Sequence, residues 1–173
     1  AVHTERFSGQ VVVITGGANG LGRGLTEALA RAGAKLVVGD IDLAAASALC
    51  IELSNRGCKA SAVAVDVTDA ASVERLVEEA VSRHGRIDYM INNGGIAAGG
   101  EFEAVSAATL RRVVEVDLLG SAYGTLSAYR QMLRQRSGHI VNVASMLALF
   151  PNPLSAAYVA AKHGLGGLTR SVM

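Results

Sequence analysis

Five short runs rich in apolar and β-branched residues alternate with longer segments of helical pattern along this chain. The runs are Val11–Thr15, Lys35–Gly39, Ala60–Val65, Ile87–Ile91 and His139–Val143. The helical segments are Leu21–Ala32, Leu43–Arg56, Ala70–His84, Ala107 to about Arg136, and about Ala156 to the end. Strands that alternate with helices in this way are typical of a parallel sheet with helices on both faces. We therefore predict an α/β, doubly wound fold with right-handed crossovers.

The segment Ala70–His84 shows the helical pattern most clearly. Its apolar residues fall on one face at helical spacing: Val73, Leu76, Val77, Ala80 and Val81. The chain has 173 residues and is 50% hydrophobic, which suits one domain with a real core. Because no linker or repeat interrupts it, residues 1–173 are predicted to form a single domain.

Composition excludes several classes of function. Basic and acidic residues nearly cancel, 16 against 15, and no basic block stands out, so neither nucleic acid nor a membrane surface is an expected partner. No apolar run approaches the ~18 residues of a membrane-spanning helix. Two cysteines, Cys50 and Cys58, are too few for a disulfide framework, which favours a reduced, cytoplasmic chain. No cluster of Cys, His and carboxylate residues has metal-ligand spacing, so no metal site is predicted.

The segment Thr15–Gly22, with the sequence TGGANGLG, joins the first predicted strand to the first helix. Glycines let the backbone turn sharply and approach a pyrophosphate, while the helix amino terminus offers free N–H groups to the phosphates. Alone, such a segment can be only a tight turn, and its G-x-x-x-G-x-G spacing departs from the common G-x-G-x-x-G. Its position favours a nicotinamide dinucleotide site, with these expected contacts: Gly16, Asn19, Gly20, Leu21 and Gly22.

Asp40 ends the second strand, 18 residues after Gly22. A carboxylate here can accept hydrogen bonds from the adenosine ribose hydroxyls and would repel a 2′-phosphate. No Arg or Lys follows it closely, and we expect Arg23, the one nearby cation, to be a solvated first-turn residue. The sequence therefore favours NAD over NADP and places Ile41 beside the cofactor. The alternative role for Asp40 is a helix N-cap, which Asp42 can serve equally well.

Asp66 and Val67 follow the third strand. A carboxylate at this strand end can meet the adenine amino group, and the valine can lie against the adenine ring. The alternative is that Asp66 caps the next helix, a role that Thr68 or Asp69 also fits. We expect both Asp66 and Val67 to contact the cofactor.

The segment Asn92–Gly95, with the sequence NNGG, follows the fourth strand. Asparagine side chains here can bridge the ends of neighbouring strands, and glycine permits a close approach of the backbone to a ligand. As an isolated motif it fits a turn equally well. Beside the other strand ends it predicts two more cofactor contacts, Asn93 and Gly95.

Tyr158 and Lys162 are four residues apart on a predicted helix and therefore share one face, and Ser145 stands 13 residues before Tyr158. A Tyr-x-x-x-Lys pair is common by chance on exposed helices. Reduction of a carbonyl, however, needs a proton donor at oxygen, and a free phenol, with a pKa of about 10, is a poor base near neutral pH. A nearby ammonium favours the phenolate, and a serine hydroxyl can hold the substrate oxygen. The three residues together predict a catalytic site with Tyr158 as general acid/base.

Together these residues resemble the short-chain dehydrogenase/reductase (SDR) family. The resemblance runs from about Gly9 to the end and rests on motifs in the family's order and spacing: TGGANGLG, Asp66, NNGG, Ser145 and YVAAK. It implies an NAD(P)-dependent oxidoreductase of alcohols and carbonyls with Rossmann-type topology. By this resemblance Tyr158 is the general acid/base, Lys162 holds the nicotinamide ribose and lowers the tyrosine pKa, and Ser145 orients the substrate oxygen.

Three features depart from the family pattern. Gly94 stands where the family usually has alanine, which should loosen that loop slightly. Asp117 stands where the family usually carries an asparagine whose main-chain carbonyl helps hold a water in a catalytic proton relay; an aspartate keeps that carbonyl, so we expect a working relay. Family members also continue past the position of Met173 with further strands and a substrate loop. We therefore expect a fold truncated after the fifth strand and the following helix.

The leading hypothesis is an NAD-dependent oxidoreductase acting on a small-molecule alcohol or ketone. Two alternatives stay open: a dinucleotide-binding module that has lost catalysis, and an NADP-dependent reductase of the ketoacyl type. The segments 95–102 and 146–151 are expected to line the substrate pocket, and their apolar or small residues indicate a hydrophobic substrate. The resemblance also implies a homodimer or homotetramer paired through the helices at about Ala107–Arg136 and Ala156–Met173. Apolar residues in the first of these fit either interface or core: Leu126, Tyr129, Met132 and Leu133.

Overall fold

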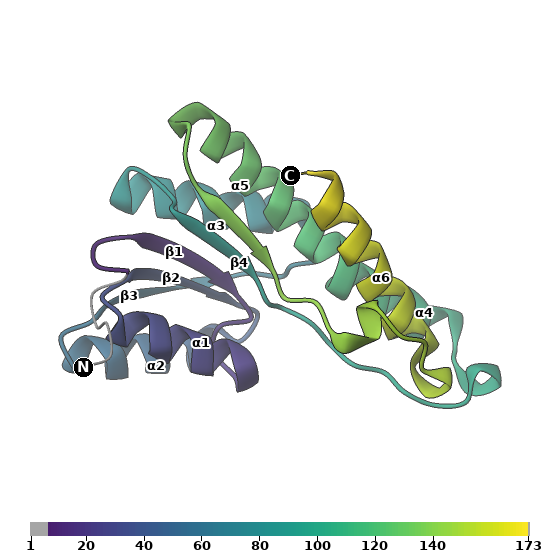
Figure 1. Ribbon diagram of the computed structural model, residues 1–173. Helices are drawn as coiled ribbons and strands as arrows, with labels where there is room; N and C mark the ends of the chain where they lie inside the picture. The colour runs from purple at the N-terminus through teal and green to yellow at the C-terminus, as the bar shows by residue number, and fades with distance from the viewer. Residues whose placement is uncertain (1–6, 173) are drawn as a thin grey trace.

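The computed structural model describes residues 7–172 and shows a central sheet between layers of helices (Figure 1). Its five strands are β1 (Val11–Thr15), β2 (Lys35–Asp40), β3 (Lys59–Ala64), β4 (Tyr89–Asn92) and β5 (His139–Asn142). Their order is β3-β2-β1-β4-β5, and each neighbouring pair is parallel. The chain thus runs outward from β1 to one edge and then crosses back to place β4 on the other side. This is the predicted doubly wound, Rossmann-type order.

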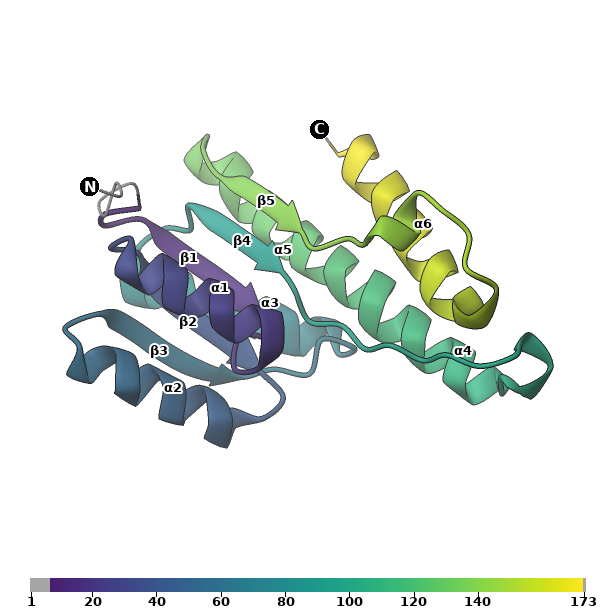
Figure 2. The same cartoon turned by 60° about the horizontal axis from the view of Figure 1, so that its bottom comes forward.

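Helices cover both faces of the sheet, as the turned view shows (Figure 2). The helices α1 (Gly20–Arg31) and α2 (Leu43–Asn55) pack on one face, and α3 (Ala70–His84) and α5 (Gly120–Gln135) pack on the other. The last helix, α6 (Ala156–Ser171), packs against α4 (Ala107–Val114). Short 3₁₀ turns occupy Phe102–Ala104, Met146–Ala148 and Pro153–Ser155. Met173, the end of the predicted last helix, lies outside the described residues.

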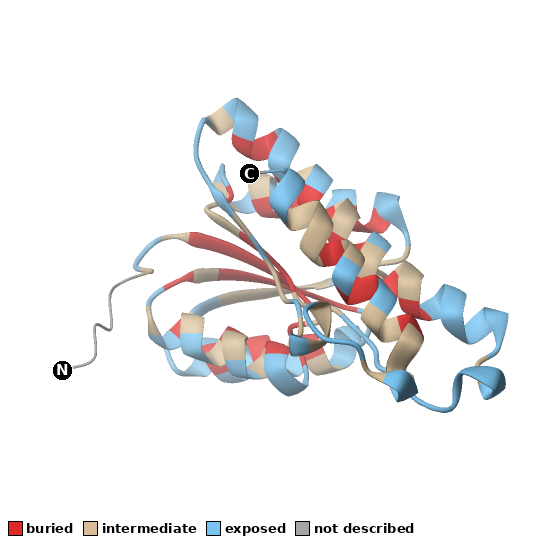
Figure 3. Ribbon diagram, turned by 45° about the vertical axis from the view of Figure 1, so that its right-hand side comes forward, coloured by how far each residue is buried: buried red, intermediate tan, exposed pale blue. Residues whose placement is uncertain are grey.

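The core lies on both sides of β1, which is buried along its whole length. Successive strand residues point to opposite faces, so Val12 and Ile14 pack with α1 and α2 while Val13 packs with α3 and α5. A strand covered on both faces favours apolar side chains on both, which explains the run of apolar residues from Val11 to Ile14. Figure 3 shows these buried strands between helices whose outer faces are exposed. Most of the predicted inner face of α3 is fully buried: Val73, Leu76, Val77 and Ala80.

The segment predicted as one helix from Ala107 to about Arg136 is interrupted. The helix α4 ends at Val114, a π-helical turn occupies Glu115–Leu119, and α5 begins at Gly120. A π-turn closes hydrogen bonds from residue i to i+5 and is frequent at functional sites. Helical pattern continues on both sides of this turn, so periodicity alone did not reveal it. The turn contains Asp117, one of the predicted site residues, and buries it completely.

Candidate functional site

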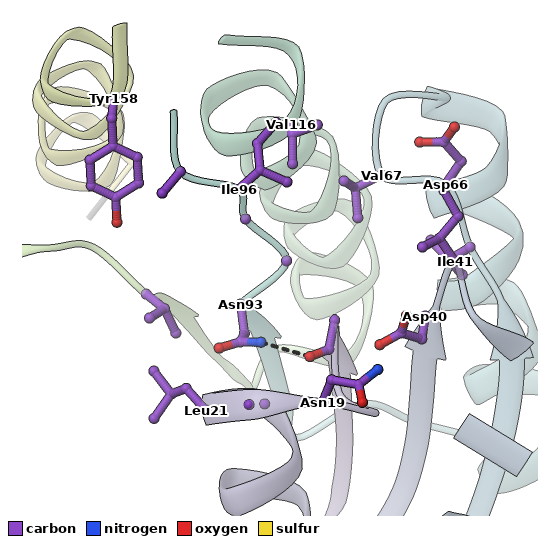
Figure 4. Close-up of a pocket in the computed structure, with 18 of the residues that line it drawn as sticks. Asn19, Leu21, Asp40, Ile41, Asp66, Val67, Asn93, Ile96, Val116 and Tyr158 are labelled. Atoms are coloured by element: carbon purple, nitrogen blue, oxygen red, sulfur yellow. Dashed lines mark hydrogen bonds between the residues drawn. The ribbon is translucent and has the colours of Figure 1, made fainter. Parts of the chain in front are cut away.

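A cavity of about 560 Å³ opens at the carboxyl ends of the strands. It lies where the loops after β1 and β4 diverge, which is the switch point of the sheet and the usual ligand position in this fold. Figure 4 shows Tyr158 at one end of the cavity and Asp66 and Val67 at the other. All the predicted cofactor contacts line it: Gly16, Asn19, Gly20, Leu21, Gly22, Asp40, Ile41, Asp66, Val67, Asn93, Gly95, Tyr158 and Lys162.

The turn between β1 and α1 requires glycine at two positions for different reasons. Gly16 has a φ of +61°, a left-handed conformation that favours glycine. At Gly22 an added Cβ would lie 1.9 Å from the carbonyl oxygen of Gly16, so a side chain there would force the turn apart. The buried Thr26 hydroxyl lies 2.8 Å from the Gly22 carbonyl oxygen and 3.0 Å from that of Gly17, and so holds the turn closed. This compact turn at a helix amino terminus fits a pyrophosphate.

Asn93 joins the end of β4 to this turn. Its side-chain amide donates hydrogen bonds to the carbonyl oxygens of Gly16 at 2.9 Å and Thr15 at 3.2 Å. Its own backbone N–H donates to the Thr15 hydroxyl at 3.1 Å. The asparagine therefore bridges the ends of two neighbouring strands, as predicted, and fixes the glycine turn against the loop after β4 (Figure 4).

Asp40 is 7% exposed and both of its carboxylate oxygens accept backbone hydrogen bonds. Oδ2 accepts the N–H of Ala18 at 2.9 Å, and Oδ1 accepts the N–H of Asp42 at 3.0 Å. The N-cap of α2 is Asp42, whose side chain accepts the N–H of Ala45. Asp40 is therefore not the helix cap. It links the end of β2 to the glycine turn and forms part of the cavity wall.

Arg23 is the cation nearest to this wall in the sequence, and its side chain in the first turn of α1 is 43% exposed, as expected of a solvated residue. Its guanidinium also pairs with two carboxylates, Glu27 on α1 and Glu52 on α2, each at 2.9 Å. These two ion pairs keep the guanidinium between α1 and α2. Within residues 7–172 the cavity lining does not include Arg23.

Asp66 lies at the end of the cavity opposite Tyr158. Its Oδ1 accepts two hydrogen bonds from Thr68, one from the backbone N–H at 2.9 Å and one from the hydroxyl at 2.7 Å. These bonds lower the pKa of the Asp66 carboxyl from its ordinary value. The N-cap of α3 is Asp69, which accepts the N–H of Ala71, so Asp66 is not the helix cap.

Lys162 is only 4% exposed, which is unusual for an ammonium group. Its Nζ donates a 3.0 Å hydrogen bond to the carbonyl oxygen of Val143, just past β5, and lies 5.5 Å from the centre of the Tyr158 ring. Burial lowers the pKa of Lys162, and the negative charge of Asp117 opposes that shift. Lys162 and Tyr158 therefore share the predicted helix face, and the ammonium lies where it favours a phenolate.

Ser145 stands beside the cavity wall rather than in it. The wall includes the two residues before it, Val143 and Ala144. The half-buried Ser145 begins a 3₁₀ turn, and its Oγ accepts the N–H of Leu147 at 3.2 Å. Because the hydroxyl acts as an acceptor in this bond, its own hydrogen is left to donate to another group.

Asp117 is 0% exposed and connects the π-helical turn to the loop after β4. Its Oδ1 accepts the N–H of Ile96 at 2.8 Å, and an added Cβ at Gly95 would lie only 2.7 Å from the same oxygen. Oδ2 is buried with no hydrogen-bond partner within residues 7–172. Burial raises the pKa of Asp117, while the Ile96 bond and the charge of Lys162 oppose the shift. The cavity lining described does not include Asp117, but its buried carboxyl interacts electrostatically with the buried ammonium of Lys162.

Several lining residues escaped the sequence motifs. Arg112 and Val116 project into the cavity from two successive turns of the helical segment before α5. Ile96 also lines the cavity, and it lies within the stretch 95–102 that was predicted to line the pocket. The spacing of four between Arg112 and Val116 was a usable signal, because such residues share a helix face. The Val143 carbonyl that binds Lys162 could not be found from the sequence, because every residue carries a backbone carbonyl. Among the described residues, no group of three His, Cys, Asp or Glu side chains could hold a metal ion.

The fold and the cavity at its switch point define a Rossmann-type dinucleotide-binding domain. Its distinguishing feature within that class is the tyrosine–lysine pair that faces the same cavity. The family model described as short chain dehydrogenase matches residues 10–173. The chain therefore belongs to the short-chain dehydrogenase/reductase family of oxidoreductases, as its motifs predict.

Similar proteins extend well beyond the length of this chain. The sex determination protein tasselseed-2 of Zea mays is 39% identical over 96% of this chain and 51% of its own length. Cis-4-hydroxycyclohexanecarboxylate dehydrogenase of Sinomonas cyclohexanicum is also 39% identical, over 96% of this chain and 67% of its own length. The crystal structure of a short-chain dehydrogenase/reductase from Burkholderia phymatum in complex with NAD has a TM-score of 0.93 at 35% identity, covering 96% of this chain and 59% of that one. This chain thus spans about half to two thirds of these proteins.

Proposed function

We propose that this protein is an NAD-dependent oxidoreductase that transfers hydride between the nicotinamide and a small-molecule alcohol or ketone, with Tyr158 as general acid/base. The observation that carries this proposal is the position of the Lys162 ammonium, 5.5 Å from the centre of the Tyr158 ring and hydrogen-bonded to the Val143 carbonyl. A cation fixed in this way stabilises a phenolate. The same cavity contains the glycine turn that fits a pyrophosphate.

The residues of this chain would manage the proton in the reaction. A bound nicotinamide would supply the hydride acceptor or donor. During oxidation the alcohol O–H proton passes to the Tyr158 phenolate as hydride leaves the carbon, and during reduction the Tyr158 hydroxyl returns a proton to the carbonyl oxygen. Ser145, whose hydroxyl hydrogen is not used by its bond with Leu147, donates to the same oxygen and stabilises its developing charge. Lys162 holds positive charge beside the phenolate.

The preference for NAD rests on Asp40. Two backbone N–H groups hold its carboxylate at the cavity wall, where its remaining lone pairs can accept from ribose hydroxyls. The nearest cation in sequence, Arg23, is paired with Glu27 and Glu52 and lies outside the cavity lining described. A 2′-phosphate beside Asp40 would therefore meet a negative charge. The competing proposal is an NADP-dependent reductase of the ketoacyl type, which requires the opposite preference.

A hydrophobic substrate is supported by the apolar residues after β5. Met146, Leu149 and Phe150 are 69%, 64% and 55% exposed and follow Ser145 directly in the chain. The described cavity lining reaches Ala144 in this segment and does not include the predicted residues 146–151. Exposed apolar side chains that follow one another in the chain nevertheless indicate a site for an apolar ligand or partner. A relative that is named borneol dehydrogenase, from Lavandula x intermedia, supports the same proposal. We therefore propose a hydrophobic secondary alcohol or ketone.

Pairing of two or four copies is proposed through the outer face of α5. Leu126, Tyr129 and Leu133 are 48%, 42% and 60% exposed there, whereas Met132 is 8% exposed and belongs to the core. The sequence could not say whether these four residues belong to the interface or to the core. The structure places Met132 in the core and the other three on the surface. Within residues 7–172 no helix has the length and apolarity to cross a membrane. A cytoplasmic location stays a prediction.

The proposed function is tested by mixing the purified protein with cyclic and linear secondary alcohols and either NAD or NADP. Formation of reduced cofactor is followed by its absorbance, and binding of NADH is followed by its fluorescence. We expect turnover with NAD and tighter binding of NADH than of NADPH. Binding of NADH with no turnover of any alcohol or ketone would favour the non-catalytic module, and tighter binding of NADPH would favour the ketoacyl-type reductase.

A further inference from the structure

Arg112 lies at the cavity end opposite Tyr158, in a part of the site that the sequence motifs left without a cation. It projects from α4 and lines the cavity together with Asp66 and Val67. Its Nη1 lies 3.5 Å from the hydroxyl oxygen of Thr68, and that hydroxyl donates a 2.7 Å hydrogen bond to Oδ1 of Asp66. A guanidinium, a hydroxyl and a carboxylate are thus connected in series, each donating to the next.

We propose that Thr68 and Arg112 are positioning residues for Asp66, holding its carboxylate so that Oδ2 accepts a hydrogen bond from the 6-amino group of the cofactor adenine. This inference rests on the proposed function and on the prediction from the sequence that Asp66 meets the adenine amino group. It assigns a role to two residues that supply no direct base contact of their own.

Orientation is the first contribution of Thr68. Within residues 7–172 both hydrogen bonds of the Asp66 side chain are to Oδ1, from the Thr68 N–H at 2.9 Å and the Thr68 hydroxyl at 2.7 Å. The Asp66 backbone is also fixed, because its N–H donates to the hydroxyl of the buried Ser72 at 3.2 Å. With one oxygen held by two donors, the other is the one available to a ligand in the cavity.

Charge is the second contribution, and Arg112 adds to it. The 6-amino group of adenine is a donor, and an ionised carboxylate is the stronger acceptor. The Thr68 hydrogen bonds, followed by the positive charge of Arg112, lower the pKa of Asp66 and so favour its ionised form. Hypoxanthine carries a carbonyl oxygen in place of the amino group. That oxygen would face a carboxylate without a hydrogen between them, so this site should discriminate between the two bases.

The chain offers a close control for Arg112. Its neighbour Arg111 is exposed on the same helix, yet the cavity lining described does not include it. Any effect of net charge or of helix stability should therefore appear in both variants. An effect through Thr68 and Asp66 should appear only when Arg112 is changed.

The test compares binding of NADH with binding of reduced nicotinamide hypoxanthine dinucleotide by fluorescence titration. We expect the parent protein to bind NADH about tenfold more tightly, the ratio that one good hydrogen bond supplies. Thr68→Val should remove most of this preference and Thr68→Ser should restore it. Arg112→Met should reduce the preference about threefold, while Arg111→Met should leave it unchanged.

Asp66→Asn separates failure of this inference from failure of the proposed function. The Thr68 donors would keep the amide oxygen at the Oδ1 position and turn the amide NH₂ toward the base, so the preference should reverse in favour of hypoxanthine. An unchanged preference in Asp66→Asn would show that adenine does not bind at this end. A reversed preference in Asp66→Asn, with Thr68→Val and Arg112→Met both like the parent, would overturn the positioning roles alone. Equal weakening of both dinucleotides by Thr68→Val would also overturn them, since it indicates a general structural role.

Discussion

Asp117 accepts the backbone N–H of Ile96 at 2.8 Å and so ties the π-helical turn to the loop after β4. The side chain is completely buried, and its second oxygen has no hydrogen-bond partner in the part of the chain described. Burial raises the pKa of this carboxyl despite the opposing influence of Ile96 and Lys162. Where the family usually carries a neutral asparagine, this chain therefore has a group whose charge the fold disfavours.

Asp117→Asn should stabilise the protein at neutral pH. Because the folded pKa of Asp117 is raised, the folded protein binds more protons than the unfolded chain, starting near the ordinary pKa of about 4. Its favourable contribution to the free energy of unfolding is thus full at low pH and is lost as the pH rises through the folded pKa. Asparagine keeps the Ile96 bond without the charge, so we expect a gain on the order of 1 kcal/mol. Urea unfolding at several pH values measures it, and a gain that persists unchanged below pH ~4 would contradict this explanation.

Asp117→Ala should behave differently, because alanine cannot accept the Ile96 N–H. The loop that carries Ile96 lines the cavity and would lose this anchor. A less ordered cavity wall should raise the KM for NAD more than it lowers kcat. Asp117→Asn should keep a KM close to that of the parent. Steady-state kinetics on both variants make the comparison. Near parental values in Asp117→Ala would argue that only the main chain of Asp117 matters.

Tyr158→Phe should lower turnover by about a hundredfold or more, the range that general acid/base groups supply. The change removes one hydroxyl and keeps the ring above which Lys162 lies. Cofactor affinity should therefore stay close to that of the parent, as measured by NADH fluorescence. Turnover that survives in Tyr158→Phe would refute the assignment of the acid/base.

The fold could be predicted because strands and helices leave a local pattern of apolar and polar residues in the sequence. The predicted bounds of the first strand match β1, and those of the other four strands differ from the structure by one or two residues for tertiary reasons. Ile87, for example, is buried like a strand residue, but its N–H donates to the side chain of Gln135 and regular pairing of β4 begins at Tyr89. The hydrophobic pattern indicates which residues are buried but not which residues they pair with. The ends of strands are therefore predicted least accurately.

The cofactor side of the site could be predicted because parallel strands bring their carboxyl ends to one edge. Asp40 ends β2, Asp66 and Asn93 lie just past β3 and β4, and all three line the cavity. The contact between Arg112 and Thr68 could not be predicted, because it joins residues 44 apart through the packing of α4 on the loop after β3. The π-helical turn that buries Asp117 also lacks a sequence signal. Both depend on how helices approach the sheet.

Asp40→Ala should reduce the preference for NADH over NADPH by about tenfold. The change removes a ribose acceptor and the negative charge that would repel a 2′-phosphate. It also removes the acceptor for the Ala18 N–H, so affinity for both cofactors should fall to some extent. Asp40→Asn is the control, since it keeps a side-chain oxygen without the charge. Fluorescence titrations give the ratio, and an unchanged ratio in both variants would show that Asp40 does not select the cofactor.

Leu133→Arg should reduce the size of the assembly if α5 forms its interface. Leu126, Tyr129 and Leu133 are spaced by three and four residues, so they form one exposed apolar stripe on this helix. A charge in this stripe would have to be buried without a partner when two copies meet.

The matched control is Ile51→Arg, because Ile51 is equally exposed, at 61% against 60% for Leu133, but lies on α2. We expect the parent and Ile51→Arg to have the mass of two or four copies by light scattering, and Leu133→Arg to have a lower mass with an unchanged Tm. A parent protein that is already monomeric, or a Leu133→Arg variant of parental mass, would remove α5 as the interface. Because Leu133 makes little contact with the core, loss of folding cannot account for the expected result.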